Sequence, residues 1–297
     1  MILIAGASGF VGSALLDELR EHAAPGGRPR LVRALVRREY DAVRLRDRGV
    51  EAVTGDLATG RGLEAALRGV RTLVYLVHTL DAPGDVVAND LEAVQNALLA
   101  ARAAGVKRVV YLGHVGASPE ARGQHLVARW AVELAVRQGG LAWLVLRAPL
   151  IAGRGSTLFE MMRRTVDRSP VVPLFRWRRT EVEPAALADV VEALRLAVDD
   201  EEMAGRTYDV TGTTRTTFGA MARAWGRKGR RPRLYLPLPG WGEGVEEQLA
   251  WSLARLPRRE TRLLLETLRE RQVADPSRRF PLGRRPLALD AALDAAR

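Results

Sequence analysis

The sequence contains no cysteine among its 297 residues. This absence excludes disulfide bonds, thiolate metal sites and thiol nucleophiles, and we expect no metal site of another kind. The sequence also lacks an apolar run of about 18 residues, the length that a membrane-spanning helix needs. It begins directly with an apolar segment, without the charged leader and cleavage site of a secretory signal. Together these features predict a cytoplasmic protein.

Acidic residues are in the minority, with 35 Asp and Glu against 46 Lys and Arg, which gives a net charge of +11. Such a balance is compatible with a nucleic acid, an anionic membrane surface or an anionic small molecule as a partner. The basic residues are spread along the chain without interleaved aromatic residues or a nucleic-acid motif, so we expect no nucleic-acid binding. The alternative is an arginine-rich surface that reflects a GC-rich genome.

Short apolar runs alternate with helical patterns in the first half of the chain. This alternation predicts parallel strands joined by helical crossovers, and therefore an α/β Rossmann fold with a doubly wound parallel sheet. Strands are expected at 1–5, 31–36, 51–53, 72–77, 107–112 and 141–147, and the clearest helices at 10–23, 84–104 and 122–138.

A glycine-rich turn, Gly6-Ala-Ser-Gly9-Phe-Val-Gly12, connects the first predicted strand to the first predicted helix. Glycines at this spacing let the backbone approach a pyrophosphate, and the helix N-terminus attracts the anion. The alternative is an ordinary structural turn. We expect this segment to contact a dinucleotide through Gly6, Ser8, Gly9, Phe10, Val11 and Gly12.

The pattern changes after Arg147, where a loop rich in glycine and proline begins. Beyond it we expect a small, mostly helical substrate region with a strand near 206–210 and an irregular tail. Its helices are predicted at 156–168, 185–199, 217–226, 243–255 and 258–273. We therefore divide the chain into a dinucleotide-binding Rossmann domain, 1–150, and a C-terminal region, 151–297, interleaved with the core at about 180–215.

The residues after strand two favour NADP(H) over NAD(H). Arg37 and Arg38 stand where an acidic residue would accept the ribose 2′-hydroxyl of NAD, and arginine suits the 2′-phosphate of NADP. Glu39 follows both arginines. The alternative is that both arginines are solvated loop residues.

Two further strand ends supply candidate cofactor contacts. Asp56 and Leu57 follow strand three, where a carboxylate can accept the adenine amino group and leucine can pack on the ring. Asp56 is equally suited to cap the next helix. Val77 and His78, with Thr79, follow strand four and are expected near the pyrophosphate or ribose, although a histidine there is often a turn residue.

These motifs amount to a family resemblance. The glycine turn, Val36-Arg37, Gly55-Asp56 and the segment 106–112 resemble the short-chain dehydrogenase/reductase (SDR) superfamily, in its atypical and extended branches, including the NmrA-like proteins. The segments 75–78, 146–153 and 159–162 are similar to bacterial atypical SDRs known as NAD(P)-binding. The resemblance covers about residues 1–215. It implies a Rossmann fold, an NAD(P) cofactor, and Pro149 near the nicotinamide.

The resemblance also implies positions for the catalytic residues, and the chain departs from the family at each of them. Gly113 stands where the family has a Ser or Thr. Glu133 sets the register of the family's Tyr-x-x-x-Lys motif, which puts His125 at the Tyr position and Arg129 at the Lys position. His125 is a candidate proton donor or acceptor, although Arg129 on the same helix face would depress its pKa. Arg129 is a candidate for the nicotinamide ribose, and His114 for the missing hydroxyl.

Two functions remain open from the sequence. The first is an oxidoreductase that transfers hydride between NADP(H) and an unidentified carbonyl, imine or activated alkene. The alternative is a non-catalytic NADP(H)-binding sensor or assembly subunit with a degenerate active site. Asp189 is expected to be a helix cap or structural partner. An anionic or polar ligand is suggested by Arg154, Arg163, Arg164, Arg176, Arg178 and Arg179, which are alternatively a solvated rim.

A third, weaker hypothesis concerns the helix expected at 258–273. Its leucines alternate with arginines in a pattern that suits peripheral membrane contact, but also ordinary packing or a homodimer interface.

Overall fold

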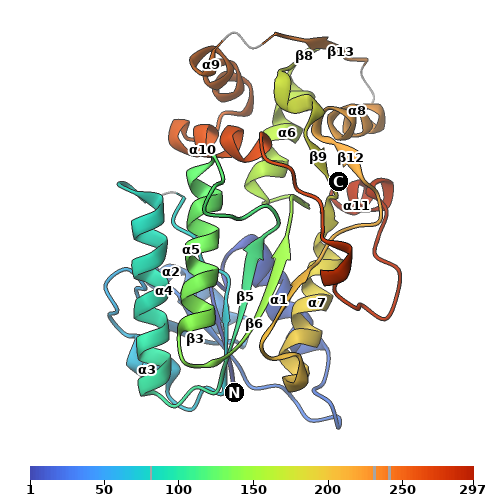
Figure 1. The fold of residues 1–297 in the computed structure, drawn as a ribbon. Coiled ribbons are helices and arrows are strands. Elements are labelled where there is room, and N and C mark those ends of the chain that lie inside the picture. The colour runs from blue at the N-terminus through green and yellow to red at the C-terminus, as the bar shows by residue number, and fades with distance from the viewer. Residues whose placement is uncertain (81, 230–231, 240–241) are drawn as a thin grey trace.

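The structure is a computed structural model that describes residues 1–80, 82–229, 232–239 and 242–297 (Figure 1). Its centre is a seven-stranded sheet with the order β11-β6-β5-β4-β1-β2-β3, in which every neighbouring pair is parallel. This confirms the predicted Rossmann fold. The strands are β1 (Ile2–Ala5), β2 (Val32–Val36), β3 (Glu51–Thr54), β4 (Thr72–Tyr75), β5 (Arg108–His114), β6 (Ala142–Ala148) and β11 (Arg206–Asp209).

Helices cover both faces of this sheet. The buried side chains of α1, α2 and α7 pack on one face, and those of α3, α4 and α5 pack on the other. The strand order reverses between β1 and β4, and dinucleotides bind at the carboxyl ends of strands beside such a switch point. The helices are α1 (Phe10–Glu21), α2 (Glu39–Asp47), α3 (Leu63–Leu67), α4 (Val86–Ala103), α5 (Gln124–Gln138) and α7 (Leu187–Asp199).

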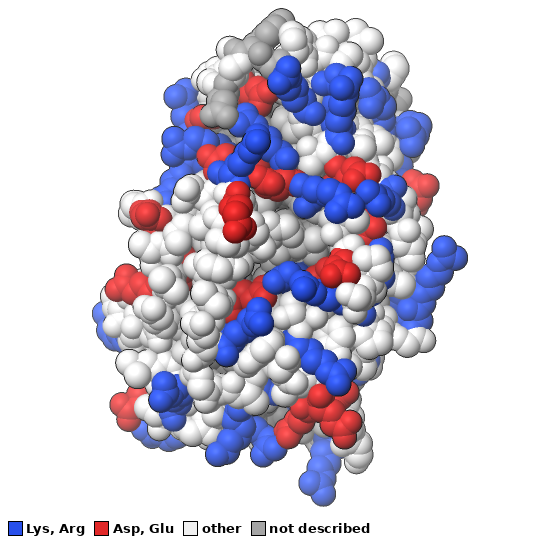
Figure 2. Space-filling model, in the orientation of Figure 1, with Lys and Arg blue, Asp and Glu red and all other residues white. Residues whose placement is uncertain are grey.

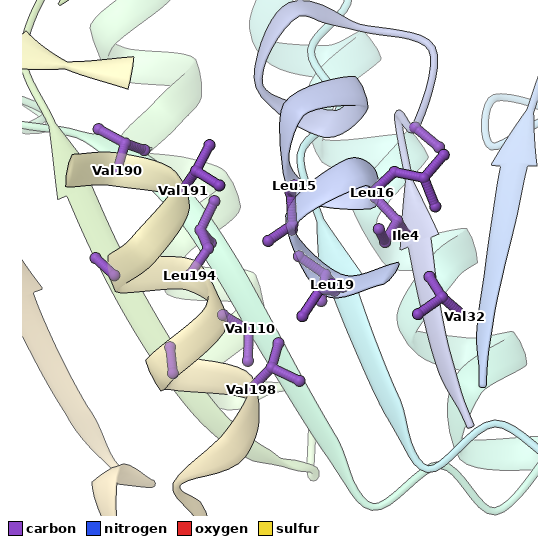
Figure 3. Close-up of a cluster of buried hydrophobic side chains, with 14 of the residues drawn as sticks. Ile4, Leu15, Leu16, Leu19, Val32, Val110, Val190, Val191, Leu194 and Val198 are labelled. Atoms are coloured by element: carbon purple, nitrogen blue, oxygen red, sulfur yellow. The ribbon is translucent and has the colours of Figure 1, made fainter. Parts of the chain in front are cut away.

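The packing of α1 beside α7 shows how the sequence periodicity produces this layer (Figure 3). Leu15 and Leu19 recur at helical spacing on α1, and Val190 and Leu194 do so on α7. All four side chains are buried against the sheet, where Val110 of β5 meets them. The apolar stripe of each helix therefore determines which face of the helix covers the sheet.

A buried ion pair connects α5 to β6. The Arg147 guanidinium donates two hydrogen bonds to the Glu133 carboxylate, at 2.8 and 2.7 Å. Glu133 is buried, so this bidentate pair fixes the rotation of α5 relative to the sheet. The same helix carries His125 and Arg129, whose side chains are thereby oriented.

The C-terminal region forms the upper end of the molecule in Figure 1. Within the described ranges, no helix is both long and apolar enough to cross a membrane. The helices of the C-terminal region are α6 (Thr157–Arg168), α8 (Phe218–Lys228), α9 (Glu243–Ala254), α10 (Arg258–Leu268) and α11 (Leu289–Ala295). Its short strands pair as β7 (Ile151–Ala152) with β10 (Ala185–Ala186), β9 (Glu181–Val182) with β12 (Thr216–Thr217), and β8 (Val171–Leu174) with β13 (Leu234–Pro237).

Two expectations for this region are wrong. The tail is not irregular, because Ala292 and Leu293 bury the face of α11 in the C-terminal core. The helix expected at 258–273 ends at Leu268, because Gln272 leaves the helical path and bridges to β9 at Val182.

Asp189 is a structural partner, as expected. Its carboxylate accepts the backbone N–H of Leu287 at 2.8 Å and pairs with Arg284 at 2.8 Å. Because Asp189 is fully buried, these contacts hold the C-terminal segment against α7.

Candidate functional site

The glycine turn has a geometry that only glycine permits. Gly6 has a φ of +89°, in the left-handed region that L side chains rarely adopt. A Cβ atom at Gly12 would lie 2.1 Å from the Gly6 carbonyl oxygen, well inside van der Waals contact. The Gly9 N–H closes the turn by donating to the same oxygen at 3.0 Å. The turn therefore brings the first residues of α1 directly against the carboxyl end of β1.

Helix N-termini point their backbone N–H groups toward anions. The cap of α1 is Gly9, which supplies no side-chain hydrogen bond, and the first turn contains no acidic residue. The loop before α6 contributes a second N-terminus to the same cleft, through Gly155, Ser156 and Thr157. This arrangement fits a pyrophosphate.

Two adjoining cavities follow the carboxyl edge of the sheet, with volumes of about 590 Å³ and about 190 Å³. The larger one, the adenosine end, is lined by Ser8, Arg37, Arg38, Asp56, Leu57, Val77, His78 and Thr79. The smaller one, the hydride end, is lined by Phe10, Val11, Gly12, Gly113, His114, His125, Arg129 and Pro149. Gly6, Gly9 and His78 line both. Every residue predicted for the site thus lies on this cleft, and their roles stay predictions.

The first acidic residue after β2, Glu39, forms an ion pair outside the adenosine end. The Glu39 carboxylate pairs with Arg46 at 2.6 Å, and Glu39 does not line the cavity, whereas Arg37, Arg38 and Asp41 do. Both arginines are exposed. Arg37 and Arg38 therefore contribute basic side chains to the lining of this end.

Asp56 does not cap the following helix, so that alternative is wrong. The cap of α3 is Gly62, and the Asp56 carboxylate instead accepts the N–H of Ala58 at 2.9 Å in a tight turn. Asn96 of α4 donates to the carbonyl of Leu57 at 2.9 Å. These contacts fix the loop that presents Asp56 and Leu57 to the adenosine end.

Phe10 connects the glycine turn to the C-terminal region. A Cβ atom at Gly153 would lie 2.5 Å from the Phe10 ring, and one at Gly155 would lie 3.1 Å from it. Gly155 also has a φ of +101°. The ring therefore packs directly on the backbone of the loop between β7 and α6, which forms one wall of the hydride end.

His125 lies at the centre of the hydride end. It is 6% exposed, and its Nδ1 has no hydrogen-bond partner among the described residues. The rings of His114 and His78 lie 6.2 and 6.5 Å from its ring, centroid to centroid. Burial lowers the pKa of His125 well below its ordinary value, and Arg129 lowers it further. His125 is therefore neutral at physiological pH. The predicted lowering of its pKa by Arg129 is confirmed, with burial as the larger cause.

His114 is also neutral. Burial lowers its pKa to about 4, against a hydrogen bond to the Val115 carbonyl that raises it. That bond places the imidazole proton on Nδ1, because a carbonyl oxygen only accepts.

Arg129 carries the positive charge of the hydride end in a buried position. Its guanidinium donates to the Val77 carbonyl at 3.4 Å, and the Tyr111 hydroxyl donates to the Arg129 carbonyl at 3.3 Å. Burial lowers the pKa of Arg129, but Tyr111 and Asp90 outweigh burial and hold the pKa above its ordinary value. The charge is thus permanent.

Sequence reasoning missed the contribution of α10 to the cleft. Leu264 and Thr267 line the hydride end, and Glu260 lines the adenosine end. Leu263, Leu265 and Leu268 of the same helix are buried, so the leucine pattern reflects packing within the chain. A packing stripe and a cleft wall share one helical periodicity, so the sequence carried no signal that separates them.

The six arginines that suggested an anionic ligand line neither cavity. Two of them, Arg163 and Arg164, pair with Glu160 at 2.8 Å each. The walls of the hydride end are instead largely apolar, through Phe10, Leu80, Leu112, Leu150, Ile151, Leu158 and Leu264.

Comparison with known proteins identifies relatives of this chain. The model of the NAD(P)H-binding family matches residues 6–194, more than half of the chain. The NAD(P)H azoreductase of Xenophilus azovorans is 35% identical over 266 residues, which cover 86% of each chain. The ceramide reductase of Caulobacter vibrioides is 33% identical over 176 residues, which are 59% of this chain and 53% of that protein. The chain thus spans about half the length of the ceramide reductase.

Two solved structures are similar in fold. The triphenylmethane reductase of Citrobacter sp., complexed with NADP(H), has a TM-score of 0.80 at 20% identity, and the match covers all of both chains. The NADPH-dependent quinone oxidoreductase of Escherichia coli, complexed with NADPH, has a TM-score of 0.79 at 19% identity and 99% coverage of each chain.

The buried neutral histidines predict a specific pH dependence of stability. Because the pKa of His114 is lowered to about 4 and that of His125 is lowered as well, the unfolded chain takes up their protons first. Stability should be highest above about pH 6.5 and fall toward about pH 4, with His114 alone removing roughly 2 kcal/mol by about pH 5. Urea unfolding at several pH values measures this. His125→Asn should flatten the slope, and His22→Asn, at an exposed histidine, should leave it unchanged; equal slopes in all three proteins would contradict the assignment.

Proposed function

The chain belongs to the NAD(P)H-binding family of atypical SDR proteins, and from this premise we propose that it is an NADP(H)-dependent oxidoreductase. We propose further that its substrate is an apolar, conjugated acceptor. The observation that carries this proposal is a hydride end with apolar walls in which the histidine at the family's tyrosine position is neutral.

The protonation state of His125 supports a class of acceptor. Reduction of an isolated ketone forms an alkoxide, which needs a proton from a general acid in the site. Neutral imidazole is a very weak acid, and burial together with the nearby Arg129 holds His125 in that form. A conjugated acceptor spreads the negative charge over several atoms after hydride transfer, so it can take its proton from water. The azoreductase, quinone oxidoreductase and triphenylmethane reductase are named for acceptors of this kind.

NADP(H) as the preferred cofactor is supported by the adenosine end. Arg37 and Arg38 line it, while Glu39 is paired with Arg46 and lies outside it. Arginine binds phosphate through charge-assisted, bidentate hydrogen bonds. Asp41 also lines this end, and a carboxylate there favours the ribose 2′-hydroxyl of NAD(H) instead.

Each residue of the cleft has a role in this proposal. NADPH, when bound, supplies the hydride. The Gly6–Gly12 turn and the N-terminus of α1 hold the pyrophosphate. Leu57 packs on adenine. Arg129, fixed by the Val77 carbonyl, donates to the nicotinamide ribose. The apolar walls orient the acceptor, and His125 holds a heteroatom of the acceptor by a neutral hydrogen bond.

A second candidate is a non-catalytic NADP(H)-binding sensor or assembly subunit. Gly113 at the family's Ser position favours it, because the site then has no hydroxyl donor at the end of β5. The two candidates differ in whether a bound cofactor is oxidised by any acceptor.

The proposal predicts which acceptors oxidise NADPH. A simple quinone should be reduced, while an isolated aliphatic ketone should not. His125→Phe should lower kcat with the quinone by less than about tenfold, because loss of a true general acid costs roughly 100-fold or more. Loss of nicotinamide absorbance under steady-state conditions measures these rates. Ketone reduction that His125→Phe abolishes would contradict the acceptor class, and tight NADPH binding without turnover on any acceptor would favour the second candidate.

Cofactor preference is tested separately. Arg37→Asp should weaken NADPH binding by roughly 10- to 100-fold, because it removes a charge-assisted contact and adds a repulsive charge. NADH binding should change by less than about threefold. Fluorescence titration with both cofactors measures this, with Arg44→Asp, an exposed arginine of α2, as the matched control. Equal losses for the two cofactors would show that Arg37 does not bind the 2′-phosphate.

A further inference from the structure

The two-stranded ribbon of β8 and β13 has an exposed apolar face at the upper end of the molecule (Figure 1). Leu234 is paired with Val171, and Leu236 with Pro173. Paired residues of parallel strands share a face of the sheet. Leu234 is 62% exposed, Leu236 44% and Val171 42%. Isolated exposed leucines are ordinary, but neighbouring ones on a single face mark an interaction surface.

The opposite face of the ribbon belongs to the core. Val172 and Leu174 are buried there, and the Tyr235 hydroxyl donates to the Ala222 carbonyl at 3.2 Å. The alternation is regular along β8 and extends from Leu234 to Leu236 of β13, with one face packed and the other open. The outer face therefore points toward solvent and is not part of the core.

Basic side chains surround this ribbon. Burial raises the pKa of Tyr235, whereas Arg233, Arg223 and Arg227 lower it, so these cations lie near the packed face of the ribbon. The side chain of Arg233 is only 9% exposed there and pairs with Asp167 at 3.9 Å. The Arg223 guanidinium lies 5.5 Å from the centre of the Tyr235 ring. Arg227 is exposed and forms no ion pair with the residues that the structure describes.

The other strand has a basic neighbour as well. Arg168 lies just before β8, is exposed, and donates to the last carbonyls of α9. The acidic neighbour Asp167 is occupied by Arg163 at 3.0 Å. Figure 2 shows lysine and arginine side chains gathered at this end of the molecule. We call the outer face of the ribbon and the two exposed arginines near it, Arg168 and Arg227, the basic tip.

We propose that the basic tip docks on an anionic phospholipid bilayer. Such a surface offers an apolar layer for Val171, Leu234 and Leu236 and negative headgroups for the surrounding arginines. A second copy of the chain is a poorer occupant, because a two-fold contact would oppose one set of arginines with the same set. Charge complementarity thus favours an anionic bilayer over a second copy of the chain.

Docking here would have a consequence for the substrate, which rests on the proposed function. Val172 and Leu174, on the inner face of the ribbon, line an apolar cavity together with Leu150 and Leu158. Leu150 and Leu158 also line the hydride end. Apolar side chains therefore extend from the basic tip to the cleft, along which an apolar acceptor would travel from the bilayer.

Vesicle co-sedimentation tests the docking itself, independently of any activity. Vesicles of phosphatidylcholine in which phosphatidylglycerol replaces part of the lipid should sediment the protein at low salt, and vesicles of phosphatidylcholine alone should not. Leu234→Ser combined with Leu236→Ser should lower vesicle affinity about tenfold. Arg168→Glu combined with Arg227→Glu should lower it by about tenfold or more. Leu99→Ser, at a 69% exposed leucine of α4, is the matched control and should bind like the wild type.

Three results would overturn the proposal. The first is absence of sedimentation with the anionic vesicles at low salt. The second is binding that the ribbon variants leave unchanged, since general basicity would then be the cause. The third is a dimer in solution, measured by light scattering, that the leucine variant dissociates, which would make the ribbon an interface between copies. None of these results bears on NADPH oxidation in solution, so the proposed function is tested separately.

Discussion

The contact between Gly12 and the carbonyl oxygen of Gly6 is the constraint on which the site depends. A Cβ atom at residue 12 would lie 2.1 Å from this oxygen, so the close approach excludes every side chain at residue 12. It brings the N-terminus of α1 to the carboxyl end of β1, beside the point where the strand order reverses. Phe10 is then placed at the start of α1, where its ring packs on Gly153 and Gly155. The glycine turn therefore positions both the anion site and one wall of the hydride end.

The electrostatics of the hydride end follow from burial on α5. The ion pair between Glu133 and Arg147 orients this helix, and Arg129 is consequently buried beside Tyr111 and Asp90. Burial keeps His125 neutral, and a permanent cation in that position lowers its pKa further. The usual acid of the SDR family is thus absent, while the cofactor cleft remains complete. A reductase for conjugated acceptors reconciles these two facts.

Local patterns predicted most of the fold and the outline of the site. These patterns are the spacing of Gly6, Gly9 and Gly12 and the positions of the strand ends, and both depend on neighbouring residues in the sequence. The site residues predicted from them all line the cleft. The protonation of His125 was not predictable to the same degree, because burial, the larger cause, arises from tertiary packing. The two-residue strands and α11 were missed because they are short and are formed by long-range contacts. The cleft-facing residues of α10 were missed because they share the helical periodicity of its packing residues.

The most direct test of this account is a crystal structure of the protein with NADPH. The account predicts the pyrophosphate at the N-terminus of α1, the 2′-phosphate beside Arg37 and Arg38, and the nicotinamide ring facing His125 between the apolar walls of the hydride end. A nicotinamide ring directed away from His125, or a pyrophosphate that does not contact the Gly6–Gly12 turn, would contradict it.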